Sequence, residues 1–152
     1  MIRTEAEYKR ALDRLRRDAE VIEAQRKHLV DMGLASDEIE RAMQPVLSFN
    51  EQLKEEVETY EQMRRGDLGV LHHLTAIGRW LIGIRIAKSM SQSELAELLG
   101  VSPAQVSRDE TNEYHGITVE RAQRILEVLG IRFKVEIEGS IDDSHNRELH
   151  HA

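Results

Sequence analysis

The sequence predicts an all-α protein with a long N-terminal helical hairpin, a compact domain of four shorter helices and one C-terminal β-strand. Two amphipathic stretches with near-heptad spacing fill residues 1–66. Capping residues and glycines then bound shorter helical segments over residues 67–130. Aromatic residues are 4% of the 152, charged residues are 32%, and there are two prolines, which is typical of a helical protein.

The first predicted helix covers residues 4–31. Gly33 ends it, and Ser36 opens the next helix. Arg26 takes the place of one apolar residue in the buried stripe, which otherwise comprises Tyr8, Leu12, Leu15, Ala19, Ile22 and Leu29.

The second predicted helix covers residues 37–65, with Pro45 predicting a kink or break near Gln44. Its stripe positions are spaced alternately by four and three residues: Ile39, Met43, Val46, Asn50, Leu53, Val57 and Tyr60. We expect the two helices to pack on each other as an antiparallel hairpin. The alternative is a surface for a second copy or a partner protein, with Asn50 fixing the register.

The four-helix domain begins after Gly66, with Asp67 as the expected N-cap of a helix that runs to about Lys88. Trp80 is expected to cover the seam with the hairpin, and the inward residues are expected to be Leu74, Ile77, Leu81, Ile84 and Ile86. The neighbouring His72 and His73 lack a third ligand at zinc spacing, so we interpret them as solvated.

Two short capped helices follow. Ser91 caps the first with Glu94 three residues later, and Gly100 ends it in a left-handed conformation. Leu95, Leu98 and Leu99 are expected to face inward. Ser102 caps the second helix, which starts with Pro103 and turns Val106 inward, and Gln105 stands at its capping-box position. Two such helices joined by a three-residue turn are a helix-turn-helix signature.

A polar loop, residues 111–116, leads to the last predicted helix, which runs from Thr118 to Leu129 and ends at Gly130. Its expected inward residues are Ala122, Ile125, Leu126 and Leu129. Residues 67–130 are therefore expected to form one helical domain.

Residues 77–131 resemble the lambda-repressor-like (Cro/C1-type, XRE) DNA-binding family. The residues that carry the resemblance are Arg85, Gln92, Ala96, Gly100, Ser102, Val106, Ser107 and Glu110. The resemblance implies that the second helix of the motif enters the DNA major groove. It also implies that Arg85 and Glu110 pair beneath that helix and orient it.

The expected DNA contacts fall on both helices of the motif, where the resemblance implies them, and on the loop that follows. Arg108 is the strongest candidate for reading a guanine, and Ala104 suits a thymine methyl group. Expected beside them at the bases are Pro103, Gln105 and Ser107. The resemblance implies that Gln92 contacts a phosphate, and Ser102 is expected to do the same. In the loop, Tyr114 and His115 are expected to contact the DNA in place of the missing basic side chains.

Two positions depart from the family pattern. Asp109 places a negative charge where the family usually has an apolar residue. The loop at residues 111–118 contains Glu113 and no lysine or arginine, so a shallow salt dependence of DNA binding is expected. These departures favour the alternative function, a protein-interaction adaptor that keeps the fold without specific DNA binding.

Residues 131–138 alternate apolar and charged side chains, as in a half-buried strand, and no second strand pattern exists in the chain. The residues involved are Ile131, Arg132, Phe133, Lys134, Val135, Glu136, Ile137 and Glu138. Antiparallel pairing of two copies about Val135 matches opposite charges and apolar side chains. We therefore predict a homodimer through this strand.

Charge is unevenly distributed along the chain, whose net charge is −7. Residues 79–134 carry 8 basic and 7 acidic side chains, so the negative charge lies outside the motif. Residues 139–152 are predicted to be a disordered acidic tail, whose His145, His150 and His151 we interpret as solvated.

These patterns predict a dimeric, sequence-specific DNA-binding regulator that represses transcription from an inverted repeat; the family also makes an autoregulating antitoxin possible. A toxin or another protein would then bind the N-terminal helices. The absence of cysteine, of a glycine-rich phosphate loop and of a zinc motif argues against an enzyme and against a cofactor. We expect no signal peptide, no membrane span and a cytoplasmic, nucleoid-associated protein.

Overall fold

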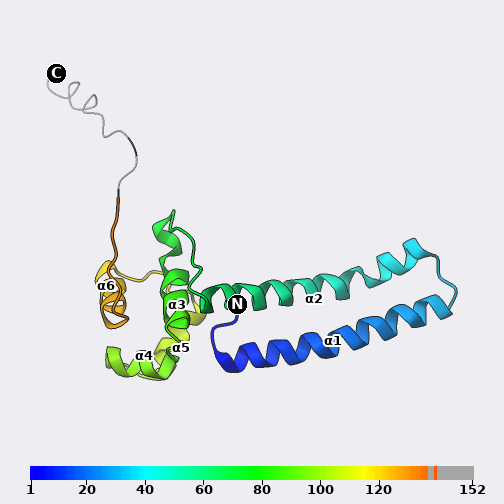
Figure 1. Ribbon diagram of the computed structural model, residues 1–152, viewed down its shortest axis with the longest axis horizontal. Helices are drawn as coiled ribbons and strands as arrows, with labels where there is room; N and C mark the ends of the chain where they lie inside the picture. The colour runs from blue at the N-terminus through cyan, green and yellow to red at the C-terminus, as the bar shows by residue number, and fades with distance from the viewer. Residues whose placement is uncertain (137–138, 140–152) are drawn as a thin grey trace, which may run out of the picture.

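The computed structural model describes residues 1–136 and 139, and its regular structure is entirely helical (Figure 1). A long hairpin projects from a compact group of short helices, as expected for an all-α protein. The elements are α1 (Glu5–Asp31), α2 (Ser36–Arg64), the 3-10 helix η1 (Leu74–Ala76), α3 (Ile77–Ala87), α4 (Gln92–Leu99), α5 (Pro103–Thr111) and α6 (Val119–Val128). No helix among the described residues combines the length and apolar character of a membrane span.

The α1–α2 hairpin closes along the two predicted stripes. The Tyr8 and Tyr60 rings stack with their centroids 5.0 Å apart. Arg26, the charged member of the α1 stripe, donates a hydrogen bond of 3.0 Å to Glu40. The helix α2 continues through Pro45 without a break, since its seam residues hold the backbone on both sides and Met43 is fully buried.

The segment between the hairpin and α3 differs from the prediction. Residues 67–73 form no helix, and α3 begins only at Ile77 after the short turn of η1. Gly69 adopts a φ of +66°, which a continuous helix excludes. Leu74, expected in the core, is 72% exposed, whereas Leu68 is partly buried against the core and lies beside Gly83 of α3.

The core of the domain forms around α3, which is buried on several sides. Leu81 and Ile82 of α3, Leu95 of α4 and Ile125 of α6 are almost fully buried, and Trp80 packs partly buried against this core. The prediction for Leu98 was wrong. Leu95 and Ala96 define the inward side of the two-turn helix α4, so Leu98 falls on another side and is 49% exposed.

Candidate nucleic-acid interface

The helix α5 is set so that one side packs on the domain and its N-terminal part faces outward. The Ser102 hydroxyl accepts a hydrogen bond from the Gln105 backbone N–H and fixes the start of the helix. Val106 is buried, whereas Pro103, Ala104 and Arg108 are exposed. The predicted base-reading positions therefore share an accessible surface, with Ser107 half-buried at its edge.

A chain of polar contacts runs along α5. Arg108 Nη2 donates to Gln105 Oε1 at 2.9 Å, and Gln105 Nε2 donates to Asp109 Oδ1 at 2.8 Å. Arg121 of α6 forms an ion pair with Asp109. The carboxylate of Asp109 is thus matched by a cation of the next helix, and Gln105 steadies the Arg108 side chain.

A buried ion pair joins α3 to α5. Arg85 Nε and Nη2 lie 2.5 and 2.6 Å from the two Glu110 carboxylate oxygens, and the side chains are 3% and 0% exposed. Arg85 also donates to the backbone oxygens of Met90, at 2.8 Å, and of Arg3, at 2.9 Å. Because the guanidinium binds both carboxylate oxygens in fork geometry, the pair fixes α5 firmly against α3.

The predicted phosphate contact, Gln92, belongs to the same cluster. Its Nε2 donates to Glu110 Oε2 at 2.8 Å, and the side chain is half-buried. It lines an open cavity of about 460 Å³ between the start of α4, the end of α2 and residues 3–5. The sequence predicted the pairing of Arg85 with Glu110 but not the contact of Gln92 with that pair. The contact with Arg3 was not predictable either, because a backbone carbonyl leaves no mark in a side-chain pattern.

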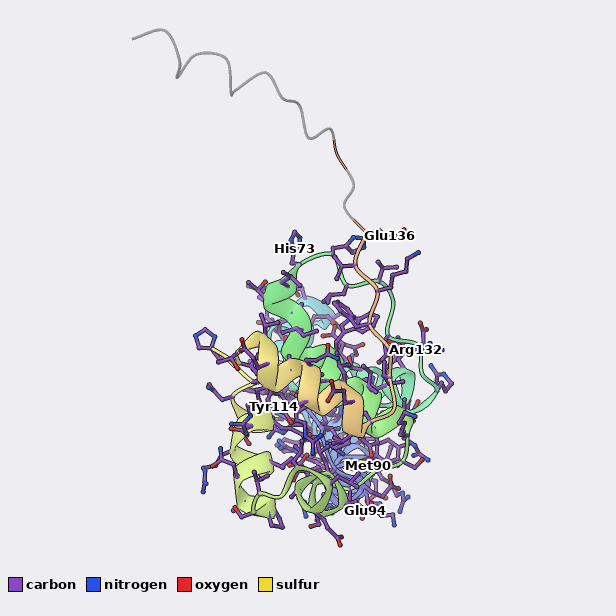
Figure 2. All side chains as sticks on the ribbon, turned by 90° about the vertical axis from the view of Figure 1, so that its left-hand side faces the viewer. His73, Met90, Glu94, Tyr114, Arg132 and Glu136 are labelled. Atoms are coloured by element: carbon purple, nitrogen blue, oxygen red, sulfur yellow. The ribbon has the colours of Figure 1, made fainter. Side chains whose placement is uncertain are left out.

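The loop after α5 corrects one predicted DNA contact. Tyr114 is only 5% exposed and its hydroxyl is buried, so this side chain does not reach a phosphate; Figure 2 places it against the body of the domain. Glu113 and Tyr114 have φ values of +49° and +53°, and this turn directs the Tyr114 ring inward. Arg79 lies 3.1 Å from the Glu113 carboxylate, and His115 remains exposed.

Replacing Tyr114 with phenylalanine is expected to leave the free energy of unfolding unchanged or to raise it by up to about 1 kcal/mol. The buried hydroxyl has no hydrogen-bond partner among the described residues, so its removal breaks no hydrogen bond there. Burial also raises the pKa of Tyr114 above its usual value of 10. Wild type should therefore lose stability above about pH 10, where the unfolded tyrosine ionises, more steeply than the variant. Urea unfolding from pH 7 to 11 measures both effects, and a loss above 1 kcal/mol at pH 7 would contradict them.

The segment that follows α6 is accessible. Residues 131–136 carry no assigned strand, and Phe133 and Val135 are 41% and 65% exposed. Lys134 pairs with Glu136 of the same segment. Figure 2 shows Arg132 and Glu136 on the side of the domain away from α5. Ile137, Glu138 and the three tail histidines lie outside the described residues.

Potential metal ligands are scattered in the described part of the chain. His72 and His73 are both exposed at the end of the irregular segment. No group of three or more histidine, aspartate or glutamate side chains within residues 1–136 and 139 has the arrangement of a metal site.

These features are those of a helix-turn-helix domain, in which a capped second helix is exposed at its N-terminal end. Residues 81–135 match the family model described as helix-turn-helix, in agreement with the resemblance of this segment to the lambda-repressor-like (XRE) family. Searches of the curated proteins and of the solved structures found no match.

Proposed function

We propose that the protein is a sequence-specific transcriptional repressor that binds an inverted repeat as a homodimer, with α5 in the major groove. The observation that carries the proposal is the exposed N-terminal surface of α5, held from below by the buried Arg85–Glu110 pair. Because Arg121 balances Asp109, the acidic departure from the family pattern does not leave an unmatched charge on α5.

The proposed roles follow the accessibility of each side chain. Arg108 reads a guanine through its O6 and N7 atoms, and Ala104 contacts a thymine methyl group. The other proposed base contacts are Pro103, Gln105 and Ser107. Gln92, Ser102 and His115 contact phosphates, with the amide ends of α4 and α5 assisting. Tyr114 has no role at the DNA, since it is buried.

Replacing Arg108 with alanine is expected to cost about 1–3 kcal/mol of discrimination at one base pair, because a bidentate guanine contact is lost. Selection from random duplexes with wild type, followed by titration of the enriched site and its single-base variants, measures this loss. Arg124→Ala removes an exposed charge from α6 and serves as the control. If no sequence is enriched by wild type, the adaptor function replaces the repressor.

The proposed dimer pairs residues 131–138 of two copies as antiparallel strands. Phe133 and Val135 are exposed, so this segment offers apolar side chains that a second copy could cover. Arg132, Lys134 and Glu136 supply the opposite charges for such a pairing. Since this segment lies away from α5, pairing leaves the recognition surface free.

A chain that ends at Gly130 is expected to be monomeric and to bind the operator at least tenfold more weakly than the full chain, since each half-site then binds alone. Sedimentation equilibrium measures the association state, and a half-site duplex provides the control because its affinity should not change. A truncated chain that still sediments as a dimer would move the interface to the hairpin.

The hairpin offers a place for a protein partner. Val21, Val30, Met32 and Phe49 are exposed apolar side chains on it. This observation favours the antitoxin variant of the proposal, in which a toxin binds the hairpin and the domain represses its own operon. Co-purification of the full chain from its host tests that variant.

A further inference from the structure

The helix α1 is electrically polarised along its length. Residues 8–17 contain five basic side chains and one acidic one, a net charge of +4. The following residues, 18–40, contain two basic and seven acidic side chains, a net charge of −5. Within α1, the positive charge therefore lies toward the helix-turn-helix domain and the negative charge toward the turn of the hairpin. The adjacent end of α2, residues 51–65, carries three basic and five acidic side chains, so the positive charge belongs to α1 alone.

The basic end of α1 lies beside the start of α4. The Arg3 carbonyl accepts a hydrogen bond from Arg85, which anchors the residues just before α1 to the ion pair under α5. Residues 3–5 line the same cavity as Ser91, Gln92 and Ser93. Figure 1 shows α1 continuing from this point along the lower edge of the molecule, in line with α4, while α2 lies above it.

The basic side chains of residues 8–17 are exposed, although Arg10 and Arg14 also line an open cavity with residues of α2. Ala11 is buried against the rest of the hairpin, whereas Lys9, Arg10 and Arg17 are exposed. Arg14 and Arg16 lie 3.5 and 3.7 Å from aspartates of α1 but keep 63% and 77% of their side chains exposed. Ion pairs at such exposure are weak, so both arginines can exchange a carboxylate for another anion.

We propose that residues 8–17 of α1 form a second DNA-binding surface, which contacts the phosphates flanking the site read by α5. The inference rests on the proposed DNA-binding function, because it needs the start of α4 to lie on the DNA backbone. Ten helical residues span roughly 15 Å. Duplex DNA presents about one phosphate charge per 1.7 Å of its axis, so roughly nine charges lie within this length.

The partner is a nucleic-acid backbone because of where the charge is placed. The helix-turn-helix segment, residues 79–134, contributes a net charge of only +1, which is small for a DNA-binding surface. The +4 segment lies next to it, and the acidic far end of the hairpin would be repelled by the same phosphates. This polarity directs α1 along the duplex with its basic end on the DNA.

The test compares two charge-matched double variants of the full chain. Lys9→Gln with Arg17→Gln removes two charges from the proposed surface. Lys27→Gln with Arg41→Gln removes two charges from the far half of the hairpin. All four replaced side chains are exposed and lie on helices. Thermal unfolding followed by circular dichroism checks that both variants keep the stability of wild type.

Binding is measured on a 40-base-pair duplex of arbitrary sequence and on the selected operator, from 50 to 300 mM KCl. The first variant should reduce the slope of log K against log salt by about 1–2, since each phosphate contact contributes about 0.9. Its affinity should fall roughly ten- to sixtyfold at 0.1 M salt, equally for both duplexes. The second variant should match wild type.

The outcomes separate the two proposals. If the slope is unchanged in the Lys9/Arg17 variant while wild type still binds DNA, the α1 surface does not bind DNA, but the proposed repressor function stands. The basic surface would then fit an acidic protein partner. An equal loss in both variants also overturns it, because the effect is then one of net charge. Wild type that prefers no sequence but shows the predicted slope change refutes the repressor and keeps the surface. Wild type that binds neither duplex refutes both.

Discussion

Replacing Glu110 with alanine is expected to lower the free energy of unfolding by about 3–5 kcal/mol. The replacement leaves the Arg85 guanidinium at 3% exposure without its carboxylate, and an unpaired buried charge is costly. It also removes the acceptor of Gln92, so α4 and α5 both lose their shared anchor. Urea unfolding at neutral pH measures the loss.

The control for this prediction removes both charges together. Arg85→Met combined with Glu110→Leu leaves no buried ion, and replacing a whole buried pair by apolar side chains is often neutral or better. The double variant should therefore be more stable than Glu110→Ala, although it loses the contacts of Arg85 with Met90 and Arg3. If the single and double variants are equally unstable, the packing of Glu110 rather than its charge determines stability.

Positions whose conformation depends on near neighbours were predictable from the sequence. The Ser91 hydroxyl accepts from the Glu94 backbone, and Gly100 ends α4 with a φ of +69°, as the capping signals require. The predicted helix start at Asp67 was wrong because Gly69 adopts a left-handed φ of +66° and Leu68 lies against Gly83 of α3. The second of these is a tertiary contact. The spacing of apolar residues over 68–86 is compatible with one helix, and it does not show that residues 67–73 are irregular.

The candidate site shows the same division between local and tertiary information. The exposed positions of α5 follow from helical spacing and from the inward direction of Val106. The balance between Asp109 and Arg121 depends on how α6 crosses α5, so sequence alone left Asp109 as an unexplained charge. Tyr114 was misplaced for a related reason: its left-handed backbone turns a polar-loop residue into the core.

Gly78→Ala is expected to lower the free energy of unfolding by about 3 kcal/mol or more. A Cβ at this position would lie 1.8 Å from the Glu113 carbonyl oxygen and 2.7 Å from its carbon. Both are backbone atoms of the turn that follows α5, and neither can rotate away as a side chain would. The added methyl group overpacks this contact, and it fits only if α3 separates from the turn. That separation would displace Tyr114.

Gly83→Ala on the same helix is the matched control. Its Cβ would meet Leu68 Cδ2 at 2.5 Å, but that atom ends a flexible side chain and can shift. Alanine is also the better helix former by about 1 kcal/mol, so this variant should lie within about 1 kcal/mol of wild type. Chemical unfolding of the two variants isolates the backbone contact, since both add one methyl group to α3. Equal stability of the two would show that the Gly78–Glu113 approach opens without cost, and the turn after α5 would then not be fixed by α3.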